Sequence, residues 1–575
     1  MQSTKAKPMK KLCKCSCCLN QIINFSSSLD HQNSSNIYNS STFQYDFATA
    51  TSSSLYPNTQ FTNPESLPTL QESFRSFTRS FPQYLTTVEA DEIRASEYRH
   101  LNVSSHVFLD YNGHALFSFS QYDHKNGEFI ASSSNSCNNS IILKENLSCI
   151  EISHVGNNRS SSSPPSPSPS SSSSEFEKKL KGRIMRYLNV LEDDYSMFIT
   201  ANQTSSFGLL SELYPFESNK NLVMVYDHEN ESLESMKKSS TKNGGRVYSA
   251  EFKWPKLKIH CTKLQEILVE SRKNKKKNKG LFVFPVQSRI SGAKYSYQWM
   301  SLARENGWHI LLDATTLNPK ETDTLGLSLL QPEFLICTVY NIFGQDPSGF
   351  SCLIVKKSIN GLLNSSKTCS FNGLVSLNDP KTKDGLCDKE VKCKGLDQTD
   401  SLGLILIGNR IRCLINWLIN ALLALYHPHS ERGVQLVQIY GPRVKFDRGS
   451  SLAFNIFDWK GEKMEPMLVQ KLADRNNISL GCGFLRHVWF SQRYQLEKEK
   501  VLVEEVEDGG KKCKGKKREC LESGGIPVVT ATISFLTNFE DMYMLWKFVS
   551  KFLDADFVEK ERWRYTALNQ KSIEV

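Results

Sequence analysis

The chain has 575 residues, of which 39% are hydrophobic, so it is long enough to bury a full-sized core in two or three domains. Its formal net charge of +10 comes from 70 basic and 60 acidic residues, and two basic runs, 272–279 and 511–517, carry much of the excess. No aromatic residues alternate with these lysines, so the runs indicate solvated loops and argue against nucleic-acid binding.

The 16 cysteines indicate the redox environment. In a long chain without a secretory signal, so many cysteines are typical of reduced thiols, which predicts a cytoplasmic protein. Residues 1–60 lack the apolar core of a signal peptide but are rich in serine and poor in acid, so plastid targeting is the alternative. The cysteines at 13–18 suggest acylation or a metal, but no second ligand group follows at zinc spacing, and no metal site is predicted.

Composition divides the N-terminal part of the chain into segments. Residues 1–68 are rich in Ser, Asn and Thr and predict a disordered tail. A large α/β domain is predicted over 69–403, because helical stretches alternate with short apolar strands, as in a mostly parallel sheet. Ser/Pro-rich or polar insertions are expected at 131–174 and 361–403. The predicted helices are Glu72–Leu101, Lys178–Leu191, Cys261–Arg272 and Tyr297–Asn306, and the predicted strands are Leu222–Tyr226, Leu281–Pro285, Ile310–Asp313 and Leu335–Val339.

The C-terminal part is predicted to form a smaller α+β domain over 426–558. The most apolar stretch, Ile411–Leu425, is too short and too interrupted by polar residues to cross a membrane, so a buried linking helix is predicted over 404–425. A charged loop is expected at 504–525 and a tail at 559–575. The predicted elements are strands at Leu436–Ile439, Leu452–Asp458 and Val528–Phe535 and a helix at Glu540–Leu553.

Two neighbouring apolar strands carry the first indication of chemistry. The run Leu311-Leu312-Asp313 ends in a carboxylate, and the next strand leads to Tyr340-Asn341 shortly before Gly344. Many pyridoxal phosphate (PLP) enzymes place an Asp against the protonated pyridine nitrogen in this way, with the Schiff-base Lys on the turn after the next strand. Asn341 stands where that Lys is expected, and a carboxamide cannot form an imine.

Four further motifs occur with this turn in a common order and spacing. Phe108–His114 resembles Y-L-D-H-A-G, Ile199–Thr204 resembles the phosphate-binding turn F-T-x-x-A-T, Phe284–Gly292 resembles P-x-x-S-N-F-S-G, and Leu311–Ala314 matches L-L-D-A. From roughly Leu70 to Asp554 the chain therefore resembles the molybdenum-cofactor sulfurases, members of the class V aminotransferase (cysteine desulfurase-like) group.

The resemblance implies the PLP-dependent transferase fold type I, with a large, mostly parallel α/β domain and a smaller α+β domain. It implies a cofactor cleft in which Thr200 and Thr204 lie at the phosphate, Gln287 lies beside the cofactor and Asp313 lies at the pyridine nitrogen. The family's ring-stacking His is replaced by Asn230, with His228 two residues away, and an amide does not supply the aromatic stack.

The sulfur-handling residues of the family are also altered. Cys482 matches the first Cys of the family run R-T-G-C-F-C-N-P-G, whereas Phe484 stands at the second. Cys482 is thus the candidate persulfide thiol, but without the family's flanking residues we expect it to be partly buried and unreactive. Thr530 falls near the position of an Arg that grips the substrate carboxylate, and it provides no forked donor.

Three functions follow from this pattern. The preferred one is a pseudoenzyme of the sulfurase-like family that binds or regulates an unidentified protein partner and holds PLP weakly and non-covalently or not at all. The second is a PLP-binding protein without an internal aldimine. The third is a sulfurtransferase, moving sulfur from cysteine to an acceptor such as the molybdenum cofactor, in which Lys294, Lys356 or Lys357 replaces the missing amine. The resemblance also implies a possible homodimer.

Overall fold

The computed structural model describes residues 59–103, 105–111, 116, 151–154, 175–269, 280–316, 331–338, 350–363, 373–378, 402, 404–428, 434–442, 448–502 and 524–569. The chain divides into two compact units, Met1–Ser54 and Leu55–Val575, and every described residue belongs to the second. The predicted tail at 1–68, the insertions at 131–174 and 361–403 and the loop at 504–525 lie largely outside the described residues.

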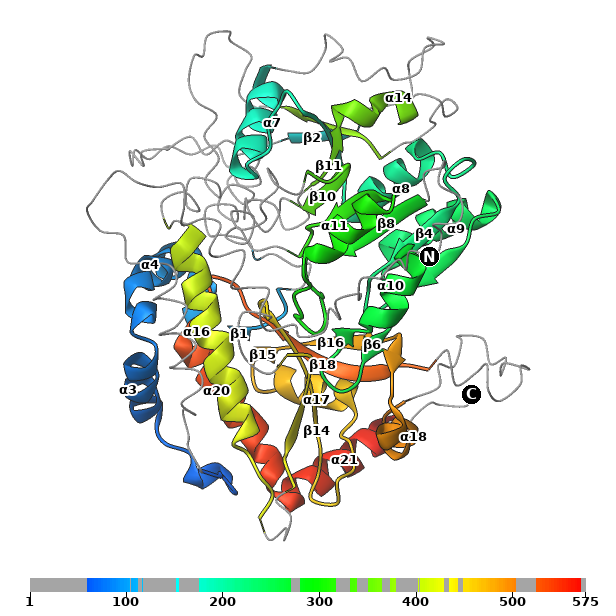
Figure 1. Ribbon diagram of the computed structural model, residues 1–575. Coiled ribbons are helices and arrows are strands. Elements are labelled where there is room, and N and C mark those ends of the chain that lie inside the picture. The colour runs from blue at the N-terminus through cyan, green and yellow to red at the C-terminus, as the bar shows by residue number, and fades with distance from the viewer. Residues whose placement is uncertain are drawn as a thin grey trace, which may run out of the picture. The chain divides into compact units, whose positions relative to one another are not determined.

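A seven-stranded sheet organises the part of the chain that carries the predicted cleft (Figure 1). Its strand order is β3-β11-β10-β9-β8-β4-β5, in which β11 is antiparallel to both of its neighbours and the remaining pairs are parallel. The strands are β3 (Tyr195–Thr200), β4 (Asn221–Met224), β5 (Val247–Ser249), β8 (Gly280–Pro285), β9 (His309–Asp313), β10 (Phe334–Thr338) and β11 (Ser351–Lys356).

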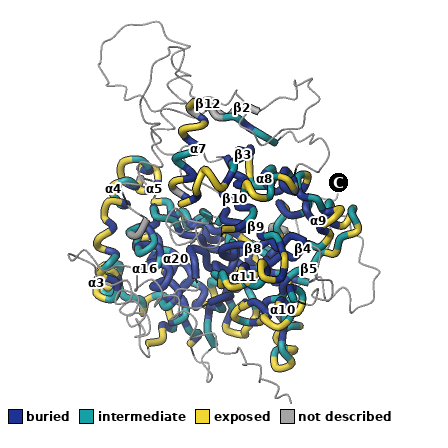
Figure 2. The backbone as a smooth tube through the Cα atoms, turned by 45° about the horizontal axis from the view of Figure 1, so that its top comes forward, coloured by how far each residue is buried: buried dark blue, intermediate teal, exposed yellow. Residues whose placement is uncertain are grey.

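Helices cover both faces of this sheet, because successive strand residues point to opposite sides. Val223 and Val225 join one apolar cluster with α7, α10 and α11, whereas Leu222, Met224 and Tyr226 join another with α8 and α9. All six residues of β8 are buried, as expected for a strand covered on both sides, and the strands lie buried between the helices in Figure 2. The helices are α7 (Glu175–Tyr187), α8 (Gln203–Leu213), α9 (Glu234–Lys242), α10 (Cys261–Val269), α11 (Gln298–Glu305) and α14 (Asn360–Leu363), with short 3₁₀ turns η4 (Glu231–Leu233) and η6 (Lys357–Ile359).

A second, antiparallel sheet of four strands has the order β13-β14-β18-β16, and α17 packs against β16 and β18. Together the two sheets confirm the predicted α/β architecture with a smaller α+β part, and the predicted strand and helix ends differ from the observed ones by a few residues. The elements of this region are β13 (Val437–Tyr440), β14 (Ser451–Ile456), α17 (Pro466–Asp474), β16 (Gly481–Leu485), η7 (Gln492–Tyr494), α18 (Gln495–Val501) and β18 (Ile526–Thr532).

Short strands that the sequence did not predict join the two sheet regions. Their residues give too few alternations for a period to be read, so only the tertiary pairing defines them. Buried Arg448 adds a further link, because it donates to the carbonyls of Ser291 and Ser451, both at 2.9 Å. The pairs are β1 (Val107–Phe108) with β15 (Ile478–Ser479), β17 (Val488–Trp489) with β6 (Phe252–Lys253) and β7 (Lys258–Ile259), and β2 (Glu151–His154) with β12 (Val375–Asn378).

Helices from both ends of the described chain pack along α16, the predicted linking helix, which runs over Leu404–Leu423. Capping boxes begin α3 at Thr69 and α20 at Asn538, and each supplies two hydrogen bonds to otherwise unpaired amides. The last helix, α21 (Ala555–Asn569), extends through most of the segment predicted as a tail. The remaining elements are η2 (Pro64–Ser66), α3 (Leu70–Ser80), η3 (Pro82–Thr87), α4 (Val88–Glu97), α5 (Arg99–Val103), α20 (Phe539–Ser550) and η8 (Lys551–Leu553).

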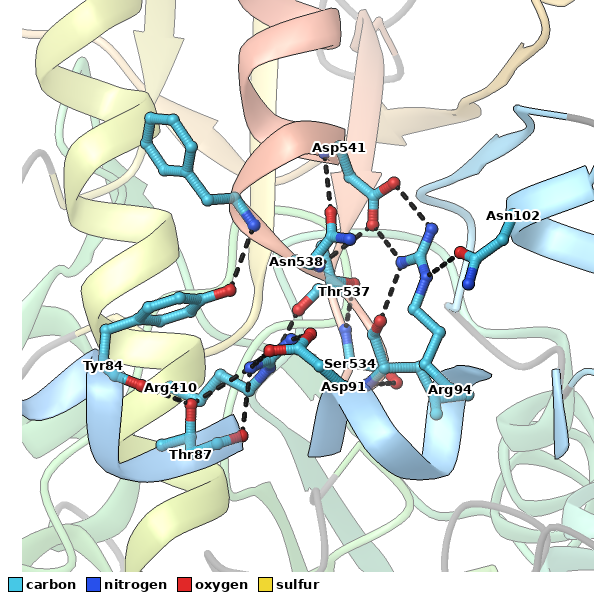
Figure 3. Close-up of polar contacts among 12 residues, drawn as sticks. Tyr84, Thr87, Asp91, Arg94, Asn102, Arg410, Ser534, Thr537, Asn538 and Asp541 are labelled. Atoms are coloured by element: carbon cyan, nitrogen blue, oxygen red, sulfur yellow. Dashed lines mark hydrogen bonds and ion pairs between the residues drawn. The ribbon is translucent and has the colours of Figure 1, made fainter. Parts of the chain in front are cut away.

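Two arginines fasten α4 between α16 and α20 (Figure 3). Arg94 pairs with Asp541 at the start of α20 and donates to the carbonyl of Leu536 at 2.8 Å. Arg410, fully buried on α16, pairs with Asp91 of α4 and donates to the carbonyl of Thr537 at 3.0 Å. Because burying an unpaired charge is costly, each arginine makes the position of α4 depend on a partner far away in the sequence.

Candidate functional site

Asp313 ends β9 at the carboxyl edge of the sheet, where parallel α/β sheets bind ligands. Its side chain is buried, and Oδ2 accepts a hydrogen bond from Tyr226 Oη at 2.7 Å. Oδ1 accepts two, from the amide of Thr315 at 3.0 Å and from Thr315 Oγ1 at 2.6 Å. The carboxylate therefore has one acceptor position left, on Oδ2, the oxygen that it shares with Tyr226.

Tyr226 meets Asp313 because the register of three strands brings them level. Met224 pairs with Val283 and Pro285 pairs with Asp313, so Tyr226 follows β4 opposite Pro285 and in line with Asp313. Burial, and then the Asp313 carboxylate, raise the pKa of Tyr226 well above its ordinary value, so the hydroxyl remains a donor at physiological pH. Sequence alone gave no signal for this residue, since it follows an ordinary apolar strand.

The predicted phosphate turn forms the start of α8. Asn202 is the N-cap, and its side chain accepts from the amide of Ser205 at 2.9 Å. Thr200 does not project a free hydroxyl into the turn, because its Oγ1 lies 2.6 Å from Ser206 Oγ in a buried pair. Among the described residues the amides at 202–204 have no hydrogen-bond acceptor, so this helix start offers donors and a positive dipole end to an anion.

Ser232 joins two of the predicted cofactor residues to each other. Thr204 Oγ1 lies 3.1 Å from Ser232 Oγ, and Asn230 Oδ1 accepts from the Ser232 amide at 3.0 Å, which caps η4. Asn230 is therefore committed to a local turn. The ring in this stretch belongs to His228, which is buried and lies edge-on to the Tyr226 ring with 5.8 Å between centroids.

Gln287 is buried and lies close to the Asp313 loop. Its Nε2 donates to the carbonyl of Thr316 at 2.7 Å, and its Oε1 has no hydrogen-bond partner among the described residues. That oxygen is packed against Gly449, where an added Cβ atom would stand 1.9 Å from it. The side chain thus contacts protein on both ends of its amide.

A buried carboxylate that the sequence did not single out organises the adjoining motif turn. Asp227 accepts from Ser288 Oγ at 2.7 Å, from Ser291 Oγ at 2.6 Å and from His228 Nδ1 at 2.9 Å. Burial alone raises the pKa of Asp227, but these hydrogen bonds outweigh it and lower the pKa below its ordinary value. The Ser-x-x-Ser-Gly spacing after β8 was the available signal, since both hydroxyls turn toward one acceptor.

Asn341, with Tyr340, Phe343, Gly344 and Gly349, lies outside the described residues. Of the amines weighed as substitutes, Lys356 lies three residues beyond Leu353, the β11 residue level with Ile336 and Asp313. That distance is about 10 Å along the strand, toward the opposite edge of the sheet from the cleft. Lys356 Nζ instead donates to Gln331 at 3.0 Å, and Lys357 follows still farther on. Lys294 pairs through its backbone with Gln287 and is the alternative nearer to the cleft.

Cys482 is exposed, which corrects the expectation of a partly buried thiol; β16 is the last strand of its sheet, so one flank lacks a neighbouring strand. The surrounding protein, with the Asp110 and Asp474 carboxylates, raises the pKa of Cys482 to about 11. Gly481 pairs with Thr530, and an added Cβ atom at Gly481 would stand 2.7 Å from Asp110 Oδ1. The fold thus brings together Asp110 of the first motif, Cys482 and buried Thr530.

Cys482 is expected to alkylate slowly despite its exposure, because little of it is thiolate at neutral pH. Iodoacetamide labelling at pH 7.5, followed by mass spectrometry, should modify it at least about tenfold more slowly than exposed Cys261. Asp110→Asn and Asp474→Asn should each speed the labelling by lowering the thiol pKa, whereas Asp193→Asn on an exposed turn should not. Equal rates at Cys482 and Cys261 in the unsubstituted chain would contradict this.

The described residues contain no group of three or more His, Cys, Asp or Glu side chains arranged to hold a metal ion. Within the same residues, none of the helices has the length and apolar character needed to cross a membrane.

Comparisons with known proteins place these features among relatives. No family model matches the chain. It is 22% identical over 512 residues to a molybdenum cofactor sulfurase of Solanum lycopersicum, covering 81% of this chain and 57% of that protein. It is 23% identical over 504 residues to the molybdenum cofactor sulfurase of Homo sapiens, covering 80% and 51%, and 24% identical over 360 residues to that of Caenorhabditis elegans, covering 58% and 48%.

Among solved structures, a cysteine desulfurase of Escherichia coli aligns with 14% identity and a TM-score of 0.49, covering 81% of this chain and 98% of that one. A cysteine desulfurase of Thermococcus onnurineus aligns with 13% identity and a TM-score of 0.48, covering 80% and 98%. The chain spans about half the length of the curated relatives that it matches. By its sequence matches, the chain is a homologue of the molybdenum cofactor sulfurases.

Proposed function

We propose that this homologue has lost lysine-dependent PLP chemistry and acts by binding, with a protein as its partner. The observation that carries the proposal is that the polar side chains of the predicted cleft hydrogen-bond within the protein. Asp313 accepts from Tyr226 and Thr315, and Gln287 Nε2 donates to Thr316. Asn341, at the position of the Schiff-base Lys, supports the same conclusion from the sequence.

The residues present fit PLP only as a non-covalent ligand. The amides at 202–204 suit its phosphate, and the remaining acceptor position of Asp313 suits its ring nitrogen. PLP, when bound, supplies an aldehyde and an electron-withdrawing ring. What this chain lacks at position 341 is the amine that would join that aldehyde.

Non-covalent PLP binding is the second candidate function. The open helix start of α8 favours it, since a fully redundant cleft has no need to leave three amides without an acceptor among the described residues. In this case the chain would hold the cofactor through the phosphate and Asp313, without an internal aldimine.

The test is to incubate the purified full-length chain with PLP, treat it with borohydride and map any fixed cofactor by peptide mass spectrometry. We expect no reducible adduct and no cysteine-dependent sulfide release, with an active molybdenum cofactor sulfurase as the positive control. Reversible PLP binding without an adduct would favour the second candidate. Sulfide release on the order of 1 per second, or an adduct at Lys294, would overturn the proposal in favour of a sulfurtransferase.

A further inference from the structure

We propose that Tyr226 competes with a protonated pyridine ring for Oδ2 of Asp313 and thereby sets how weakly the cleft takes PLP. The inference deepens the proposed function and rests on it, because it concerns a cleft in which PLP has no lysine to join. It names one side chain of this protein as the determinant of ligand affinity.

The strand geometry supports this role. β4 and β9 flank β8, so the backbones that carry Tyr226 and Asp313 are two strand spacings apart, about 9.6 Å. Both side chains project to the α8 face of the sheet, since Tyr226 clusters with Met224, and Asp313 follows Leu311 of that cluster by two residues. A tyrosine is long enough to cross this gap over the end of β8, and its hydroxyl reaches Oδ2 at 2.7 Å.

The distribution of donors makes the competition specific to one oxygen. Thr315 fills both acceptor positions of Oδ1, so an incoming pyridinium N–H must share Oδ2 with Tyr226 or displace it. Tyr226 is itself buried and remains protonated, so it satisfies the carboxylate when no ligand is present. The ligand class that this contact governs is a phosphorylated pyridine, whose phosphate would lie on the helix start of α8.

The experiment compares PLP affinities, measured by absorbance titration without reduction, in the unsubstituted chain and in Tyr226→Phe. We expect the substitution to lower the Kd for PLP at least about tenfold. Affinity for inorganic phosphate alone should not change, because Tyr226 does not contact the α8 turn. Thr315→Val, which removes a donor to Oδ1, should give no such gain. Tyr214→Phe should give none either, since this buried tyrosine pairs with His309 at 2.9 Å.

An unchanged or higher Kd in folded Tyr226→Phe would overturn the inference. Should that variant fail to fold, 3-fluorotyrosine at position 226 retains the ring and the hydroxyl. Its ¹⁹F resonance should then shift on saturation with PLP and not with phosphate, and no shift with PLP would overturn the inference. A borohydride-reducible adduct in the unsubstituted chain overturns the proposed function instead, so the two failures are distinguishable.

Discussion

Replacing Asn341 with lysine is expected to convert a chain that forms no borohydride-reducible PLP adduct into one that forms the adduct at residue 341. A lysine amine adds to the PLP aldehyde, whereas the carboxamide does not. The measurement is absorbance of the aldimine, followed by reduction and peptide mapping. Cysteine desulfuration is not expected to return, because Asn230 caps a turn, Thr530 offers no guanidinium and Cys482 remains a protonated thiol.

The matched control is Asn341→Gln, which keeps an amide and should form no adduct. A lysine at 341 that stays unmodified at saturating PLP, in protein shown to be folded by circular dichroism, would contradict the predicted position of this residue. Full desulfurase activity in the same variant would show instead that the single missing amine was the whole of the loss.

Replacing Asp541 with alanine is expected to lower the free energy of unfolding by about 3–5 kcal/mol. Arg94 and Asp541 are both buried, so removing the carboxylate leaves a guanidinium without its counter-charge. Asp541 also accepts from the amide of Asn538 at 3.0 Å, so the same substitution removes a cap of α20. Urea denaturation followed by circular dichroism measures the change.

Two variants separate the causes of this loss. Asp541→Asn keeps an acceptor for the cap and removes only the charge, so it should recover part of the stability. Lys263→Ala breaks the exposed pair with Glu251 and should cost at most about 1 kcal/mol. A loss no larger in Asp541→Ala than in Lys263→Ala would show that the pair does not fasten α4 to α20.

The sequence by itself determined what local pattern controls. Alternating apolar strands and helices placed β4, β8, β9 and β10 close to their observed positions, because burial on both faces of a sheet requires apolar strands. Asp313 at a strand end and the capped start of α8 were also predictable, since strand ends and N-caps depend on residues near in sequence. The exchange of Lys for Asn341 needed no structure at all.

The tertiary structure decided which groups satisfy one another. Tyr226 and Asp313 are 87 residues apart, and Arg94 and Asp541 are 447 residues apart. Strand register in the first pair and helix packing in the second bring them together. Neither follows from local propensity, because a side chain chooses its partner by three-dimensional proximity while the pattern of one element fixes only which face that side chain occupies. The occupied state of the Asp313 carboxylate, on which the proposed function depends, is therefore a property of the folded chain alone.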